Sequence, residues 1–106
     1  WEAELITLAL TNLIDNAIDF SPPGSTVAVE LQGSTVAVQD SGPGVPDYAL
    51  TRLGERFFTT ARPSGERSGS GLGLAIVQRV VALHGGHMVV RNTAPGLRVS
   101  LELPPP

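Results

Sequence analysis

Three alternating glycines, Gly69, Gly71 and Gly73, end a polar loop and lead directly into an apolar segment with helical periodicity. Glycine lets the main chain approach a ligand without a Cβ in the way. The first N–H groups of a helix lack partners within the helix and carry partial positive charge. A phosphate group suits both features, so residues 69–74 predict an anion site, although a hinge or a tight turn has the same composition.

A second set of polar residues repeats at helical spacing. Asn12, Asn16 and Asp19 are four and three residues apart, which places them on one stripe of a helix. A solvated helix face has the same polarity and is the simpler explanation. A carboxamide oxygen, however, is a hard and neutral ligand that can complete the shell of a Mg²⁺ ion already held by phosphates and water. We therefore take Asn16 as the candidate metal ligand.

Asp40 follows an alternating apolar strand directly and precedes Ser41, Gly42, Pro43 and Gly44. A carboxylate at a strand end can accept a hydrogen bond from the exocyclic amine of adenine, and the glycines let a base lie against the main chain. An Asx-type turn is the alternative, because Asp-Ser-Gly is common turn chemistry. The combination with the glycine-rich segment favours a nucleotide site.

The composition describes one small globular domain. The chain has 106 residues, 42% of them hydrophobic and 16% charged, which is enough for a single core. A net charge of -3 argues against a nucleic-acid surface, which is normally basic. The absence of cysteine excludes disulfides, thiolate catalysis and cysteine–zinc sites. The apolar stretch 5–20 is interrupted by polar residues, so we expect no membrane contact by this chain.

Periodicity predicts the elements that position these residues. Helices are expected at 4–19 and 72–84, with a short helix from 46 to about 53. Strands are expected at 26–31 and 35–39 in one hairpin, and at 88–92 and 97–103 in a second. Residues 54–70 show no period and form a long loop of the kind used as a lid. This order predicts a two-layer α/β sandwich, with helices on one face of a mostly antiparallel mixed sheet.

The same patterns predict which side chains form the core. The expected core residues are Ile6, Leu10, Leu13, Ile14, Ala17 and Ile18 on the first helix, Leu72, Ile76, Val77, Val80, Val81 and Leu83 on the last, and Val27, Val29, Leu31, Val36, Val38, Leu97, Val99, Leu101 and Leu103 on the strands. His84, beside a helix C-terminus, is explained by capping of that helix.

Four segments in order resemble the boxes of the GHKL (Bergerat) nucleotide-binding fold, and within it the catalytic ATP-binding domain of sensor histidine kinases. Residues 12–17 resemble its N box, 40–44 its G1 box, 55–58 its F box and 69–74 its G2 box. The likeness spans nearly the whole chain. Residues 16–22 and 46–50 look most like the CreC branch of these kinases.

The resemblance implies that residues 1–106 are one catalytic domain that binds ATP with Mg²⁺ and passes the γ-phosphoryl group to a histidine on a separate dimerisation domain. A response regulator would act downstream. The implied roles are magnesium coordination by Asn16 and adenine recognition by Asp40, with Phe57 and Phe58 anchoring the lid. The ATP-binding set it implies is Asn12, Asn16, Asp19, Phe20, Asp40, Gly42, Gly44, Phe57, Phe58, Arg62, Arg67, Gly69, Ser70, Gly71, Leu72 and Gly73, with Asn12 and Asn16 catalytic.

The family also implies a context for the domain. The acceptor histidine of these kinases precedes the catalytic domain, so we expect the chain to be an excised cytoplasmic piece of an inner-membrane sensor protein. We also expect the family's opening strand to be missing or clipped, which would leave one edge of the sheet uncovered.

Asn12 bears on the type of reaction. ATP-hydrolysing relatives such as gyrase carry a glutamate at this place, one helical turn before the magnesium asparagine, where it activates water. An amide cannot act as a general base. The resemblance therefore implies phosphoryl transfer rather than hydrolysis, with catalysis by positioning and charge stabilisation.

Two other nucleotide-binding motifs do not fit this sequence, whereas two other functions stay possible within the same fold. Leu74 stands where a dinucleotide-binding motif requires its last glycine, and the chain has no Gly-Lys-Ser/Thr of a P-loop. Asp19 stands where many family members carry a basic residue, and a carboxylate there repels ATP unless it faces water or an arginine. A pseudokinase or interaction module therefore stays open as an alternative. So does a serine kinase of an anti-sigma system, because it shares the fold.

The arginines before the glycines provide a first prediction. All seven basic residues are arginine, and Arg52, Arg56, Arg62 and Arg67 fall between positions 52 and 67. We expect Arg62 or Arg67 to meet the phosphate charge that Asp19 does not. The double variant Arg62→Ala/Arg67→Ala should bind ATP–Mg²⁺ more weakly than the parent in a fluorescent-ATP titration. Equal affinity would contradict this role.

Overall fold

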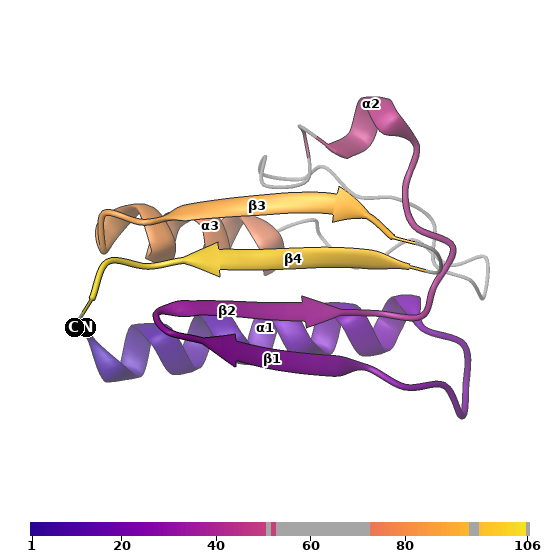
Figure 1. The fold of residues 1–106 in the computed structure, drawn as a ribbon, viewed down its shortest axis with the longest axis horizontal. Coiled ribbons are helices and arrows are strands. Elements are labelled where there is room, and N and C mark those ends of the chain that lie inside the picture. The colour runs from indigo at the N-terminus through magenta and orange to yellow at the C-terminus, as the bar shows by residue number, and fades with distance from the viewer. Residues whose placement is uncertain (51, 53–72, 94–95, 106) are drawn as a thin grey trace.

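The computed structural model describes residues 1–50, 52, 73–93 and 96–105 (Figure 1). In chain order the elements are α1 (Ala3–Phe20), β1 (Ala28–Gln32), β2 (Thr35–Gln39), α2 (Asp47–Leu50), α3 (Gly73–Leu83), β3 (His87–Asn92) and β4 (Leu97–Glu102). The predicted helices and strands are all present, and their ends either agree with the prediction or differ from it by at most three residues. None of the described helices is both long enough and apolar enough to cross a bilayer.

The strands form one sheet in the order β1-β2-β4-β3, and all three neighbouring pairs are antiparallel. Val38 on β2 lies opposite Val29 on β1 and Val99 on β4, so these three side chains share one face of the sheet. Figure 1 shows α1 and α3 side by side behind this sheet. The two-layer α/β architecture expected from the element order is confirmed.

The core lies between the helices and the sheet. Helix α1 buries Ala9, Leu13 and Ala17, which recur every four residues on one face. From α3 and the strands, the core receives Leu74, Val77, Val80, Val81, Val38, Leu97, Val99, Leu101 and Leu103. Two alanines on the buried face of α1 leave room for the helix to lie close to its neighbours.

The other face of the sheet is polar. The guanidinium of Arg98 on β4 donates to Oε1 of Gln39 on β2 at 3.3 Å and to Oε2 of Glu30 on β1 at 2.9 Å. This hydrogen bond and the positive charge of Arg98 hold the pKa of Glu30 below its ordinary value. A sheet with one apolar and one polar face needs only a single layer of helices to cover it.

Four residues predicted for the core are exposed instead. The exposed fractions are 57% for Ile18, 54% for Val29, 71% for Leu31 and 58% for Leu83. All five residues of the edge strand β1 are exposed. Ile18 lies on a side of α1 outside the buried face formed by Ala9, Leu13 and Ala17. Leu83 ends α3. The apolar faces were predicted correctly, but the helical layer does not extend over their margins. Leu72 lies outside the described residues.

The two ends of the described chain are joined by side-chain hydrogen bonds. The indole N–H of Trp1 donates to the carbonyl of Pro104 at 2.7 Å, and the N–H of Glu2 donates to Nε2 of His84 at 2.9 Å. Because Nε2 accepts, the proton of neutral His84 lies on Nδ1, which is 2.8 Å from the carbonyl of Val80. His84 therefore caps α3, as predicted, and also ties its end to the start of α1.

The difference between Leu13 and Ile18 provides a matched test of the core. Leu13 is 1% exposed, so Leu13→Ala should lower the free energy of unfolding by about 2–5 kcal/mol. Ile18→Ala, on the same helix but at an exposed position, should lower it by less than about 1 kcal/mol. Urea denaturation followed by circular dichroism measures both. Equal losses would show that the margin of α1 is buried after all.

Candidate functional site

The side chain of Asp40 lies at the end of β2 and is almost fully buried, with 5% of its surface exposed. Its Oδ1 accepts two main-chain hydrogen bonds, from Gly42 at 2.9 Å and from Leu97 at 3.1 Å. The N–H of Asp40 donates in turn to the carbonyl of Leu97 at 3.0 Å. No group in the described part of the chain donates to Oδ2. A buried carboxylate oxygen with an unused acceptor suits a ligand that brings a donor.

The protonation of Asp40 reflects this environment. Burial raises the pKa of its carboxyl group, and the hydrogen bonds from Gly42 and Leu97 oppose that effect. Desolvation disfavours the ionised form, whereas N–H donors favour it. The site therefore holds a desolvated carboxylate that gains from any further hydrogen-bond donor.

Two glycines let the main chain pack tightly around Asp40. A Cβ on Gly42 would overlap the carbonyl oxygen of Phe20, the last residue of α1. A Cβ on Gly96, whose φ is +96°, would overlap the carbonyl oxygen of Asp40 itself. Any larger residue at either position would push these segments apart. Gly42 was predicted for the site from its motif, whereas Gly96 was not.

A hydroxyl connects the end of α1 to the loop after β2. Oγ of Ser21 donates to the carbonyl of Ala17 at 2.8 Å and accepts from the N–H of Ser41 at 3.1 Å. Oγ of Ser41 donates to the carbonyl of Thr26. These bonds hold the segment with Asn16 and the segment with Asp40 next to each other. Ser21 was not among the predicted site residues.

The other end of the predicted site is the contact between α1 and α3. Nδ2 of Asn12 donates to the carbonyl of Leu8 at 2.9 Å, so its Oδ1 is the atom that faces outward. That oxygen lies 3.7 Å from where a Cβ of Gly73 would stand. The N-terminus of α3, whose first N–H groups lack partners within the helix, therefore lies beside the amide of Asn12.

Asn16 lies one turn further along the same stripe of α1. Its side chain is half-buried, and it makes no hydrogen bond within the described part of the chain. A carboxamide oxygen in this state is free to bind a cation, so the residue fits the Mg²⁺ role expected of it. Asp19 is exposed.

The structure thus places Asn12, Asn16 and Phe20 along α1 and Gly73 at the start of α3. Asp40 and Gly42 lie beside the C-terminal end of α1, whereas Gly44 lies against Asn92 and Gly96. The remaining predicted site residues lie outside the described residues: Phe57, Phe58, Arg62, Arg67, Gly69, Ser70, Gly71 and Leu72. The loop 54–70 is also outside them.

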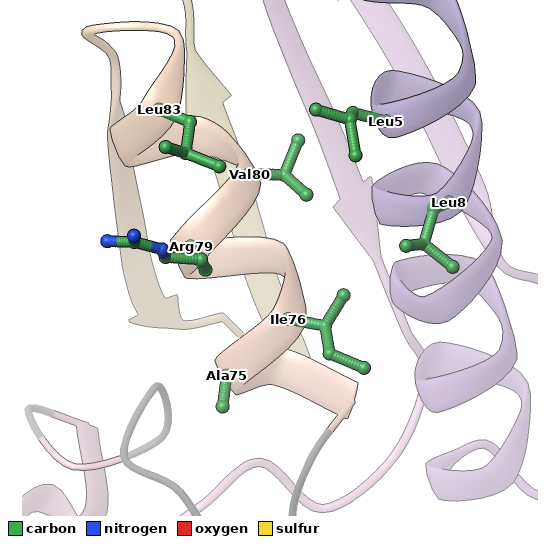
Figure 2. Close-up of a pocket in the computed structure, with 7 residues that line it drawn as sticks. All are labelled: Leu5, Leu8, Ala75, Ile76, Arg79, Val80 and Leu83. Carbon is green, nitrogen blue, oxygen red and sulfur yellow. The ribbon is translucent and has the colours of Figure 1, made fainter.

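An apolar cavity of about 360 Å³ lies elsewhere, between α1 and α3. In Figure 2, Leu5 and Leu8 from α1 face Ile76 and Val80 from α3 across it, with Arg79 at its margin. This lining offers little to a triphosphate. We therefore do not assign the nucleotide to this cavity.

Comparisons with known proteins identify the family of the chain. Residues 2–106 match the family model described as histidine kinase-, DNA gyrase B-, and HSP90-like ATPase. The chain is 48% identical over 93 residues to the sensor protein QseC of Escherichia coli K12, and 44% identical over 99 residues to the sensor protein CreC of the same strain. These alignments cover 87% and 90% of the chain but only 20% and 21% of the relatives. The chain thus spans about a fifth of their length.

Solved structures show the same fold. A mycobacterial sensor histidine kinase, MprB, superposes with a TM-score of 0.81 at 35% identity, over 98% of this chain and 72% of that one. The cytoplasmic segment of histidine kinase QseC superposes with a TM-score of 0.68 at 28% identity, over all of this chain and 52% of that one. Both are similar to the present chain along nearly its whole length.

The raised pKa of Asp40 predicts how stability changes with pH. Its folded-state pKa lies above the ordinary value of 3.8, so its contribution is fully present below pH 3.8 and is lost as the pH rises through the folded-state value. The free energy of unfolding of the parent, relative to Asp40→Asn, should therefore fall between pH 3 and pH 7 in urea titrations. Exposed Asp15→Asn is the matched control. A relative stability that rises with pH would contradict the expectation.

Proposed function

Since the chain belongs to the family of histidine kinase-, DNA gyrase B- and HSP90-like ATPases, and is the catalytic domain of a two-component sensor histidine kinase, we propose that Asp40, Asn16 and the start of α3 bind ATP with Mg²⁺. The γ-phosphoryl group then passes to a histidine on a separate dimerisation domain. In this proposal, residues 1–106 form one catalytic unit, and residues 54–70 form its lid.

The observation that carries the proposal is Oδ2 of Asp40, to which no group of the described residues donates. Oδ1 is held by the N–H groups of Gly42 and Leu97, and this fixes the direction in which Oδ2 points. The exocyclic amine of adenine is a donor that Oδ2 can accept, whereas the carbonyl of guanine at the corresponding position would be repelled. A rigid carboxylate therefore supports both binding and selectivity for adenine.

Asn16 and the N-terminus of α3 account for the phosphate end. Asn16 is half-buried, and its side-chain oxygen adds a neutral ligand to a cation that also binds phosphates. When bound, Mg²⁺ neutralises the charge that develops on the transferred group. The glycines at 69, 71 and 73 let main-chain N–H groups approach the phosphates, and Phe57 and Phe58 anchor the lid.

Asn12 supports transfer rather than hydrolysis. Its Nδ2 is bonded to Leu8, and its Oδ1 faces the start of α3. An amide takes no proton from water, so no residue at this place activates a water molecule for attack on ATP. The domain holds the γ-phosphoryl group for an external nucleophile, which the dimerisation domain supplies.

The wider context is also part of the proposal. The domain acts on the cytoplasmic side of an inner-membrane sensor and feeds a response regulator; its likeness to the cytoplasmic segment of QseC supports this placement. Assignment to the CreC branch stays a prediction from residues 16–22 and 46–50. The sequence identities to QseC (48%) and to CreC (44%) differ too little to favour either branch.

Binding of fluorescent ATP with and without Mg²⁺ tests the site. Asp40→Asn should weaken binding by at least about tenfold, because a hydrogen bond to a charged group contributes about 1.5–3 kcal/mol. An amide that keeps Oδ1 for the two main-chain donors turns its NH₂ towards adenine, where donor meets donor. Asp15→Asn, which removes an exposed carboxylate from the outer face of α1, should bind as the parent does.

The same titration separates the alternatives. If ATP does not bind, or if its binding is unaffected by Mg²⁺ and by Asp40→Asn, a pseudokinase or interaction module is favoured. The carboxylate of Asp19 is the observation that supports this alternative. A serine kinase would bind ATP equally well. It is distinguished by its phosphorylated product, because phosphoserine survives acid whereas phosphohistidine is hydrolysed.

A further inference from the structure

Asn92, the last residue of β3, makes two hydrogen bonds to the main chain of a single distant residue. Its Nδ2 donates to the carbonyl of Val45 at 2.7 Å, and its Oδ1 accepts from the N–H of Val45 at 2.9 Å. The two residues are 47 positions apart. The carboxamide therefore pairs with Val45 as a neighbouring strand would, although Val45 belongs to no strand.

Val45 is the far end of the loop that begins at Asp40. Within that loop, Gly44 has a φ of +75°, and a Cβ on it would lie 2.6 Å from Oδ1 of Asn92. The amide thus packs against Gly44 while it binds Val45. Pro43 has no N–H, so the loop has few donors of its own with which to fix its shape.

The near end of the loop is held by the residue opposite Asn92. In the antiparallel register of β3 and β4, Asn92 pairs with Leu97. Leu97 exchanges hydrogen bonds with Asp40, through its N–H to Oδ1 and through its carbonyl to the N–H of Asp40. One residue pair of the β3–β4 hairpin therefore holds both ends of the loop from Asp40 to Val45.

We propose that Asn92 is a positioning residue for adenine. It holds Val45, and through Val45 it sets the place of Gly42, Pro43 and Gly44, the main chain along which the base lies when its amine meets Asp40. This inference rests on the proposed ATP site and assigns Asn92 no contact with the nucleotide.

The substitutions Asn92→Asp and Asn92→Ala separate charge from loss of contact. Asn92→Asp keeps the size and the acceptor for Val45 but turns a second oxygen towards the carbonyl of Val45, where it is repelled. Asn92→Ala removes both bonds. Gln32→Glu is the control, because it makes the same amide-to-carboxylate change at an exposed position on the edge strand β1.

Two measurements on the 106-residue chain test the proposal. Hydrogen exchange at the amide of Val45, without nucleotide, should become faster in both Asn92 variants and not in Gln32→Glu. Affinity for ATP–Mg²⁺ should fall at least about fivefold, whereas affinity for inorganic tripolyphosphate–Mg²⁺, measured by competition, should stay within about twofold. Partial unfolding would weaken both ligands equally, so the ratio of the two affinities isolates the adenine end.

Each of three other results would contradict a different part of the argument. Unchanged exchange at Val45 would show that Asn92 does not hold the loop. Faster exchange with an unchanged ratio of affinities would show that the loop does not position adenine. A parent chain that binds neither ATP nor tripolyphosphate would overturn the proposed function itself, and this outcome is recognised without any substitution.

Discussion

One oxygen atom joins the two halves of this chain. Oδ1 of Asp40 accepts from Gly42 in its own loop and from Leu97, which lies 57 residues further along. Because the carboxylate is buried, these bonds operate with little competition from water, and the loop after β2 can adopt its shape only when the β3–β4 hairpin is in place. The arrangement of the remaining site residues depends on this bond, because α1 packs against the same loop through Gly42 and Ser21.

The remaining elements hold Asp40 and the loop after β2 in place. Helix α1 rests on the sheet through Ala9, Leu13 and Ala17 and presents Asn12 and Asn16 on an adjacent stripe. The core therefore determines both the distance of α1 from the sheet and the direction of its amides. Hydrogen bonds at Trp1, Glu2 and His84 fix the opposite ends of α1 and α3. A site built mainly from helix ends and strand ends thus rests on elements that cannot shift independently.

Local patterns were sufficient to predict every described helix and strand, and the motifs identified Asn16 and Asp40. Periodicity identifies the apolar face of an element but not what covers it, which is why Ile18 and Leu31 were assigned to the core and are exposed. The roles of Gly96 and Asn92 depend on Asp40 and Val45, which lie dozens of residues away in the sequence. The residues next to Gly96 and Asn92 in the sequence give no sign of these contacts. The sequence also suggested a lid at 54–70 with its arginines, which lies outside the described residues.

The contact between Gly42 and the carbonyl of Phe20 has a consequence for how relatives of this domain can diverge. Every residue has a main-chain carbonyl group, so this contact requires glycine at position 42 but does not require phenylalanine at position 20. The contact therefore restricts substitution of Gly42 and permits substitution of Phe20. Variation at the end of α1 can accumulate beside an unchanged loop after β2, which allows one architecture to acquire different neighbours while this loop keeps its shape.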